Sequence, residues 1–260
     1  MAKPQVFFVH GMWSQAGVWS HWKPRFEAKG YTCTALTLPG HAKGAAEASL
    51  CGLGIAQYTD SVVQALRPWP KPIVVGHSMG GLIAQQVAAL VPLTAAVLVN
   101  SAAPAPVFAL RPVMLPGLAR HFARWALWRK SFRLAPWEAQ HLLFNALPAA
   151  QQAEQQSALQ AESGRVAYQL GFGALNLAGS NRVARERIRC PLLALAGAQD
   201  HIIPIGVSRA MATWYGNQLD YREHPQHAHW MLGEPGWRAR VDEVLNWLEK
   251  PAEYALAAIN

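Results

Sequence analysis

Three side chains in this sequence have the types and the chain order that nucleophilic catalysis requires. Ser78 stands in the string Gly76-His77-Ser78-Met79-Gly80, after the apolar run 73–75 and at the start of a helical pattern. A serine on a sharp turn between a strand and a helix projects its hydroxyl from the strand's tip, and flanking glycines let neighbouring backbone come close. This setting predicts that Ser78 is a nucleophile.

A serine hydroxyl needs a base to remove its proton, and the base works best beside an acid that orients it. The acid candidate is Asp200, in the loop that follows the apolar run 191–196. The base candidate is His229, between the last predicted strand and the final predicted helix. His227 lies two residues earlier and is the alternative base. The predicted triad therefore runs in the order Ser78, Asp200, His229.

Predicted strands and helices that alternate along the chain must hold these residues. Apolar runs predict strands over 6–9, 31–38, 73–75, 96–99, 191–196 and 218–222. Helical patterns cover 18–29, 55–67, 78–90, 207–215 and 237–250. Such alternation is typical of the α/β class, with a doubly wound, mostly parallel sheet covered on both faces. Because ligands of such sheets gather at the carboxyl ends of the strands, we expect the candidate residues to meet there.

The strand signals stop between Pro104 and Arg185, where helical patterns rich in Leu, Ala, Trp and Gln take over. We therefore predict an α/β core formed by residues 1–104 and 186–260, with an inserted helical cap over 105–185. The cap holds nine Lys and Arg against three Glu, a net charge of +6, whereas the whole chain has a net charge of +8. Most of the excess positive charge thus belongs to the predicted cap.

Four segments make the chain resemble the α/β-hydrolase fold superfamily, in particular its compact serine esterase-like branch with plant-type esterases, hydroxynitrile lyases and their bacterial relatives. They are His10-Gly11-Met12-Trp13, Leu38-Pro39-Gly40-His41, Gly76 to Gly81, and Gly197 to Asp200 followed by His229-Trp230. The triad of this superfamily runs in the order found here. Its usual spacing, together with the following Trp230, favours His229 over His227.

The resemblance also implies an oxyanion hole and shows two departures from the family's pattern. The turn at Ser78 supplies the backbone N–H of Met79, and the family's pattern implies the backbone N–H of Met12 as the second donor. Thr37 stands where an acidic residue is often found before the Leu-Pro-Gly turn, and Ala228 stands where glycine commonly precedes the histidine. Ala228 keeps the choice between the two histidines open.

The predicted cap is rich in large apolar side chains, which suit either packing or a substrate pocket. An amphipathic helix that packs on a domain shows the same spacing, so most of these residues are expected in the core. Small-molecule sites are mostly apolar with few polar groups, and the predicted pocket walls are Trp13, Trp125, Trp128 and Trp230. This composition favours a hydrophobic ester as the small-molecule substrate.

The predicted activity is therefore ester hydrolysis through an acyl-enzyme, with alternatives that the sequence leaves open. The same triad could hydrolyse a thioester, a lactone or a carbon–carbon bond. It could also carry out cofactor-free perhydrolysis. A different class of function is ligand binding without catalysis on a hydrolase scaffold. The intact set of nucleophile, acid and base favours the enzyme.

Composition and motifs exclude several other classes of function. The three cysteines are scattered and show neither a disulfide framework nor zinc-ligand spacing, and glycine pairs at 52–54 and 171–173 lack the rest of a dinucleotide fingerprint, so no metal or cofactor is expected. Charged residues make up only 15% of the chain and form no basic block, which disfavours nucleic acid. The basic cap could touch a membrane surface, but a solvated helix face is favoured. The first residues lack a secretory signal, which predicts a cytoplasmic location.

Overall fold

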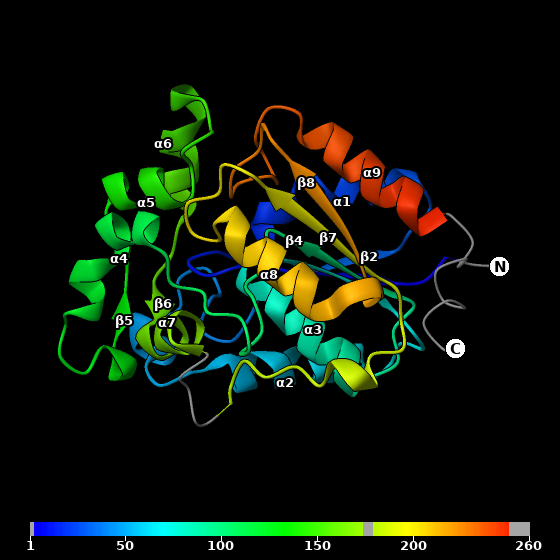
Figure 1. Ribbon diagram of the computed structural model, residues 1–260, viewed down its shortest axis with the longest axis horizontal. Coiled ribbons are helices and arrows are strands. Elements are labelled where there is room, and N and C mark those ends of the chain that lie inside the picture. Colours follow the sequence, from blue (N-terminus) through cyan, green and yellow to red (C-terminus); the bar gives the residue numbers. More distant parts are fainter. Residues whose placement is uncertain (1–2, 174–178, 250–260) are drawn as a thin grey trace.

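The computed structural model describes residues 3–173 and 179–249, and its centre is a six-stranded sheet with the order β2-β1-β3-β4-β7-β8 (Figure 1). The strands are β1 Val6–Val9, β2 Cys33–Leu36, β3 Ile73–His77, β4 Ala95–Val99, β7 Leu192–Gly197 and β8 Leu219–His224. Every neighbouring pair in this sheet is parallel. The chain proceeds from β1 to the β2 edge and then crosses back to β3, so the predicted doubly wound α/β architecture is confirmed.

Helices cover both faces of the sheet, and the strands alternate their side chains between two cores. On one face lie α2 (Ile55–Leu66), α3 (Met79–Leu90) and α8 (Ile205–Tyr215); on the other lie α1 (Lys23–Ala28) and α9 (Trp237–Glu249). In β1, Phe7 and Val9 enter the first core, whereas Val6 and Phe8 enter the second. A strand buried on both faces needs an uninterrupted apolar run, which explains the sequence pattern.

Element boundaries differ from the predicted ones by one or two residues in most strands and helices, and two of the differences have local causes. The predicted helix 18–29 is divided into a 3-10 turn, η1 (Ala16–Trp19), and α1, whose second residue is Pro24. Proline lacks an N–H and suits the first turn of a helix rather than its interior. The predicted strand 31–38 is shorter because the N–H of Leu38 donates to Nε2 of His10 instead of extending the strand. The last residue of the predicted helix 237–250 lies outside the described residues.

In its described residues, the cap segment (residues 105–185) contains four α-helices: α4 (Leu115–Phe122), α5 (Pro136–Leu142), α6 (Ala149–Ala158) and α7 (Gly164–Gly171). They lie together to the left of the sheet in Figure 1. The segment also holds β5 (Ser131–Phe132) and β6 (Glu162–Ser163), which form a short antiparallel ribbon that the sequence did not predict. Two-residue strands are too short to produce a periodic signal. The division into core and cap domains stays a prediction.

Short 3-10 turns complete the described secondary structure. Besides η1 they are η2 (Glu47–Leu50), η3 (Pro112–Met114), η4 (Leu127–Arg129), η6 (Arg185–Arg187) and η7 (Gly216–Gln218). Three of them, η3, η4 and η6, lie within or at the end of the cap segment.

A buried polar cluster ties the cap segment to the rest of the molecule. The carboxylate of Glu162 in β6 accepts a hydrogen bond from the Tyr58 hydroxyl at 2.9 Å and lies 3.1 Å from His41 Nε2. Burial alone would lower the pKa of His41, but the hydrogen bond and charge of Glu162, with backbone contacts at Pro39 and Leu38, raise it above 6.5. A charged hydrogen bond in a buried site is strong, so Glu162 anchors the ribbon on α2.

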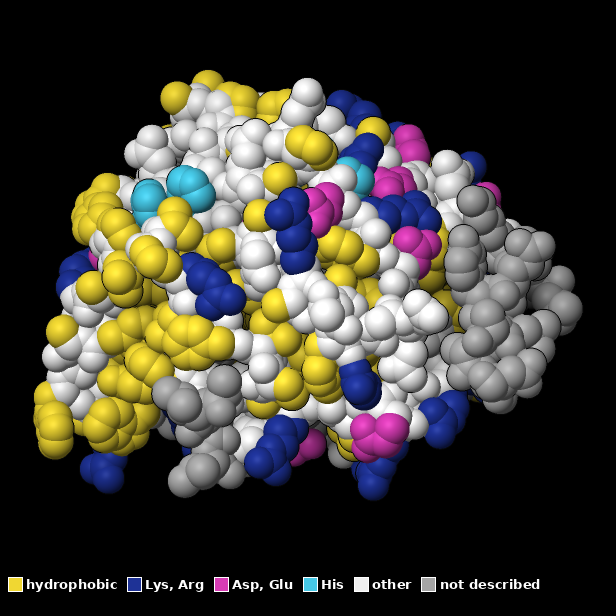
Figure 2. Space-filling model, viewed as in Figure 1, with side chains coloured by type: hydrophobic (Ala, Val, Ile, Leu, Met, Phe, Trp, Pro, Cys, Tyr) yellow, Lys and Arg dark blue, Asp and Glu magenta, His cyan; other side chains and the backbone are white. Residues whose placement is uncertain are grey.

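The surface of the cap segment exposes several large apolar side chains. Figure 2 shows hydrophobic side chains gathered over this part of the molecule, and the exposed ones include Phe108, Leu115, Trp125, Trp128 and Trp137. None of the helices in the described ranges has the length and apolar character needed to cross a membrane. The solvated helix face that is favoured for the basic cap and the cytoplasmic location both stay predictions.

Candidate active site

Ser78 occupies the sharp turn between β3 and α3 that the sequence predicts. Its φ of 56° and ψ of −120° lie in a region that L-residues other than glycine rarely adopt. A Cβ at Gly76 would come closer than 3.0 Å to the carbonyl oxygen of Gly80, and a Cβ at Gly80 would come equally close to that of Val9. Only glycine fits at both positions, because β1, β3 and the start of α3 meet there.

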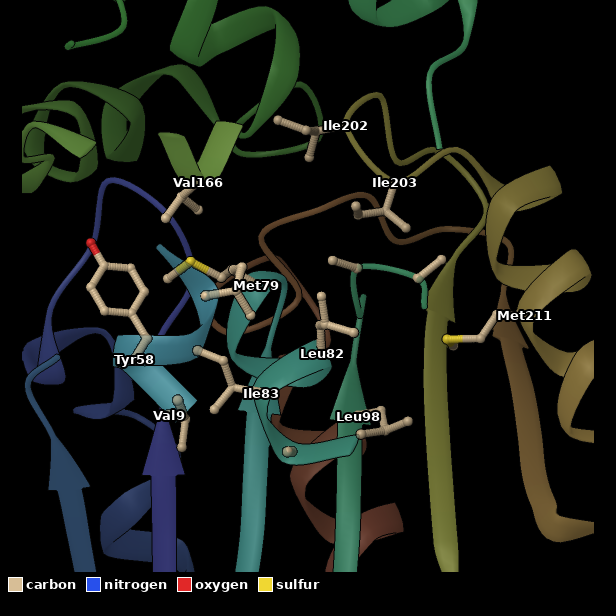
Figure 3. Close-up of a cluster of buried hydrophobic side chains, with 14 of the residues drawn as sticks. Val9, Tyr58, Met79, Leu82, Ile83, Leu98, Val166, Ile202, Ile203 and Met211 are labelled. Atoms are coloured by element: carbon tan, nitrogen blue, oxygen red, sulfur yellow. The ribbon is translucent and has the colours of Figure 1, made fainter. Parts of the chain in front are cut away.

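The turn directs Ser78 toward a cavity at the carboxyl edge of the sheet. Ser78 is 8% exposed and is one of the residues that line this cavity. Its backbone N–H donates to the carbonyl of Val99 at 3.0 Å, which holds the turn against the end of β4. In Figure 3, Met79 lies at the start of α3. Val166 from the cap segment and Ile203 from the loop after β7 lie above it in this view.

Asp200 and His229 form a buried hydrogen-bonded pair. Asp200 lies in the loop between β7 and α8, His229 follows β8, and both are at most 3% exposed. Nδ1 of His229 lies 2.7 Å from Oδ2 of Asp200, while Oδ1 of Asp200 accepts hydrogen bonds from the N–H groups of Ile202 and Ile203, both at 2.8 Å. The carboxylate therefore accepts a hydrogen bond from Nδ1–H, which leaves Nε2 as the ring nitrogen that can accept a proton from Ser78.

Two residues that the sequence did not predict as site residues hold the backbone of His229. Nε2–H of His77 donates to the His229 carbonyl at 2.9 Å, and Nδ2 of Asn100 donates to the same oxygen at 2.9 Å and to the Ala228 carbonyl at 2.8 Å. Oδ1 of Asn100 accepts from the N–H of Gly197 at 2.7 Å. Burial, and then the nearby His229, lower the pKa of His77 well below 6.5, so its ring is neutral. The signal available was a polar residue at the end of an apolar strand.

The site therefore brings Ser78, Asp200 and His229 to one edge of the sheet. The ring centroids of His77 and His229 are 4.7 Å apart, so the residue before Ser78 touches the candidate base. Among the residues that the structure describes, no hydrogen bond joins the Ser78 hydroxyl to Nε2 of His229. Catalytic hydrogen bonds are commonly loose without substrate and tighten in the substrate complex.

His227, the alternative base, is paired with a different carboxylate. Its Nδ1 lies 3.1 Å from Oε2 of Glu234, and the same oxygen accepts the N–H of Ala228 at 2.9 Å. His229 thus pairs with Asp200, and His227 pairs with Glu234. This geometry favours His229 as the partner of Asp200.

The loop that carries the predicted oxyanion donor lies against Ser78. A Cβ at Gly11 would be 2.8 Å from the Cβ of Ser78, so only glycine allows this approach. Nδ1–H of His10 donates to the Gly11 carbonyl at 2.8 Å; burial, and then the nearby His41, lower the pKa of His10 to about 3 and keep it neutral. Within the described ranges the N–H groups of Met12 and Met79 have no hydrogen-bond partner. Both remain available to an oxyanion.

The cavity is apolar, and the structure corrects three of the four predicted pocket walls. Trp13 lines the cavity as predicted. Trp125 is 84% exposed and packs against Trp128 on the outer surface, and Trp230 is buried between Phe144 and His77, so these three tryptophans lie outside the lining. The lining comprises Met12, Trp13, Ser78, Ala102, Ala103, Ala109, Met114, Leu118, His121, Phe122, Leu127, Phe132, Ala167, Leu170, Gly171, Ile202 and Ile203.

Among the described residues, no three His, Cys, Asp or Glu side chains are grouped so that they could hold a metal ion. Two of the residues that line the cavity, Ser78 and His121, carry a hydroxyl and an imidazole. The arrangement can therefore perform chemistry that depends on a hydroxyl, an imidazole and a carboxylate.

Comparison with known proteins identifies relatives of this arrangement. A family model described as "Alpha/beta hydrolase family" matches residues 6–241. Methylesterase 3 of Arabidopsis thaliana is 33% identical over 87 residues, which amount to 31% of this chain and 32% of that protein. The match thus spans about a third of the length of the curated relative.

Solved structures resemble this chain over nearly its whole length. A pyrethroid hydrolase from Sphingobium faniae has a TM-score of 0.73 at 19% identity, covering 96% of this chain and 99% of that one. An Arabidopsis methylesterase has a TM-score of 0.70 at 15% identity, covering 95% and 99%. Tomato methylketone synthase I, in complex with 2-tridecanone, has a TM-score of 0.73 at 13% identity, covering 95% and 98%. At these identities the likeness shows a shared fold.

Proposed function

The chain belongs to the alpha/beta hydrolase family, and we propose that it hydrolyses carboxylic esters with Ser78 as nucleophile, His229 as general base and Asp200 as the acid that orients the base. The observation that carries this proposal is the 2.7 Å pair of Asp200 and His229 beside a serine in strained backbone. The names of the relatives, methylesterase and pyrethroid hydrolase, point to the same class of reaction.

In the proposed first half-reaction, the Ser78 oxygen adds to the carbonyl carbon while its proton moves to Nε2 of His229. The N–H groups of Met12 and Met79 stabilise the negative charge on the former carbonyl oxygen. Collapse of the tetrahedral intermediate breaks the bond to the alcohol, which takes the proton from His229, and the acyl group stays on Ser78.

The second half-reaction repeats the same steps with water. His229 takes a proton from water, the hydroxide adds to the acyl carbon, and collapse releases the acid as Ser78 regains its proton. Asp200 keeps the imidazole in the productive tautomer and stabilises the imidazolium that forms twice in each turnover.

The lining of the cavity supports a hydrophobic ester as the substrate. The cap segment contributes one wall, with Met114, Leu118, Phe122, Leu127 and Phe132, and the loop after β7 contributes Ile202 and Ile203. Apolar substrate groups would gain about 25 cal/mol for each Å² that they bury against these side chains. Charged substrate groups would lose hydration without finding a counter-ion there.

The proposed nucleophile is tested with p-nitrophenyl esters of increasing acyl length and with a fluorophosphonate label. We expect wild type to hydrolyse the esters and to be labelled on Ser78, and we expect Ser78→Ala to lose both properties while keeping its melting temperature. Ser61→Ala is the matched control, because the Ser61 hydroxyl donates a hydrogen bond to the Tyr58 carbonyl within α2, at 2.7 Å.

Hydrolysis by Ser78→Ala at the wild-type rate, or labelling of another residue, would refute the assignment. Absence of turnover and labelling in wild type would instead support ligand binding without catalysis. The same protein samples, offered thioesters and lactones, rank the alternative acyl substrates.

A further inference from the structure

The cavity above Ser78 is lined by a histidine that the proposed reaction does not use. His121, from α4, lines the cavity and is 3% exposed. Its ring packs against Phe132 with centroids 4.7 Å apart, and Phe132 packs in turn against Trp13 at 5.5 Å. The ring of Phe132 therefore lies between His121 and Trp13, the residue that follows the proposed oxyanion donor Met12. This position is suited to contact a remote part of the substrate rather than the scissile bond.

A buried glutamate fixes the tautomer of His121. Nε2 of His121 lies 3.0 Å from Oε2 of Glu138, which is fully buried in α5. Both oxygens of Glu138 are bonded to the guanidinium of Arg120, and Oε2 also accepts the N–H of Ala135 at 2.7 Å. Burial alone would raise the pKa of Glu138, but hydrogen bonds from Arg120, Ala135 and His121 lower it to about 2. The carboxylate is ionised at neutral pH and holds the proton of His121 on Nε2.

The other nitrogen of His121 is left without a partner. Nδ1 is buried and has no hydrogen-bond partner among the residues that the structure describes. In the neutral ring with a proton on Nε2, Nδ1 is an acceptor. Buried acceptors are nearly always satisfied, and an unsatisfied one costs free energy. A water enclosed beside apolar side chains would find few further partners there, so a substrate group is the better match.

The indole nitrogen of Trp13 makes a useful contrast. It is also buried without a partner, but so are the indole nitrogens of Trp19 and Trp22, which belong to the core on the opposite face of the sheet. An unpaired indole N–H is therefore not special to the cavity. His121 differs, because an ionised carboxylate and an arginine are arranged behind it to orient a single ring.

We propose that Nδ1 of His121 accepts a hydrogen bond from a hydroxyl group of the substrate, and that the enzyme favours apolar esters that carry a hydroxyl away from the scissile bond. This inference rests on the proposed ester hydrolysis at Ser78. The apolar lining binds the body of such an ester, and His121 distinguishes it from analogues without the hydroxyl. A site built to bond a substrate hydroxyl discriminates strongly, because its own polar group is otherwise left unpaired.

The first test compares methyl phenylacetate with its 2-, 3- and 4-hydroxy derivatives and with the corresponding methoxy derivatives. In wild type we expect at least one hydroxy isomer to exceed the parent ester about tenfold or more in kcat/KM, and its methoxy counterpart to show no gain. His121→Phe keeps a ring but removes the acceptor, so the ratio of kcat/KM between the hydroxy ester and the parent ester should fall to about one. His121→Asn retains an acceptor near Nδ1 and should restore part of the gain.

Equal kcat/KM for the parent and all hydroxy isomers in wild type would overturn the proposal, whether or not the variants fold. A gain that persists in His121→Phe would overturn it too. Near-ultraviolet circular dichroism and the melting temperature check that the variants keep their packing.

The second test separates this inference from the proposed reaction. Calorimetric titration of the parent and hydroxy esters into Ser78→Ala needs no turnover. We expect the preferred hydroxy ester to bind about tenfold more tightly than the parent, and we expect the double variant Ser78→Ala, His121→Phe to lose the difference. Equal binding, or no binding of either ester, would overturn the role of His121. Failure of wild type to hydrolyse any ester, with the binding difference intact, would refute only the proposed reaction.

Discussion

Replacing Asp200 with asparagine should disable the proposed base by reversing its tautomer. In the structure, Oδ1 of Asp200 accepts two backbone N–H groups, from Ile202 and Ile203, each at 2.8 Å. An asparagine in the same place must keep its carbonyl oxygen toward these donors. Its NH₂ group then faces Nδ1 of His229, which has to accept a hydrogen bond, so the proton moves to Nε2. A ring protonated on Nε2 cannot take the proton of Ser78.

The size of the effect follows from the cost of the opposite amide orientation. Turning the asparagine over would restore the productive tautomer but leave the N–H groups of Ile202 and Ile203 unpaired, at about 1–3 kcal/mol each. A total of about 2–6 kcal/mol corresponds to roughly 30-fold to 20,000-fold less of the productive form. Loss of the charge that stabilises the imidazolium adds to this, so we expect kcat to fall about 10⁴-fold.

The assay is kcat/KM for p-nitrophenyl acetate, measured with protein whose melting temperature and circular dichroism match wild type. The matched control is Glu234→Gln, which makes the same carboxylate-to-amide change beside His227. We expect this control to keep kcat/KM within about threefold, since nothing in the proposed reaction uses His227. Retention of more than about a tenth of the wild-type kcat/KM by Asp200→Asn would refute the reversal of the His229 tautomer. A large loss in Glu234→Gln with little in Asp200→Asn would identify His227 as the base.

Two further predictions concern stability. Gly80→Ala drives a Cβ into the carbonyl of Val9 and should lower the free energy of unfolding by about 3 kcal/mol or more, whereas Gly17→Ala meets nothing within 4 Å and should change it by less than about 1 kcal/mol in urea unfolding. Equal values would contradict the packing argument. The raised pKa of His41 stabilises the folded state below the unfolded pKa of about 6.5, and this contribution is lost as pH rises through the folded value. The melting-temperature difference between wild type and His41→Asn should therefore shrink with increasing pH, and a growing difference would exclude the pairing of His41 with Glu162.

Local patterns in the sequence were sufficient for the architecture and for the candidate nucleophile. Uninterrupted apolar runs indicate strands buried on both faces, and a serine between glycines at the junction with a helix indicates the sharp turn at Ser78. These features depend on neighbours within a few residues. Because parallel strands end at one edge of a sheet, the alternation also predicted that Asp200 and His229 would lie near that edge.

Contacts between residues far apart in the chain were decided only by the tertiary structure. The choice of carboxylate for each histidine, the bonds from His77 and Asn100 to the His229 loop, and the outward position of Trp125 all depend on how separate segments pack. The sequence contains His121 and Glu138 seventeen positions apart without any spacing that links them. Folding buries the pair in the cap segment and leaves one ring nitrogen unpaired beside the cavity. An unpaired polar atom costs free energy only where water cannot reach it. Burial therefore makes this nitrogen favour a substrate that brings a hydrogen-bond donor.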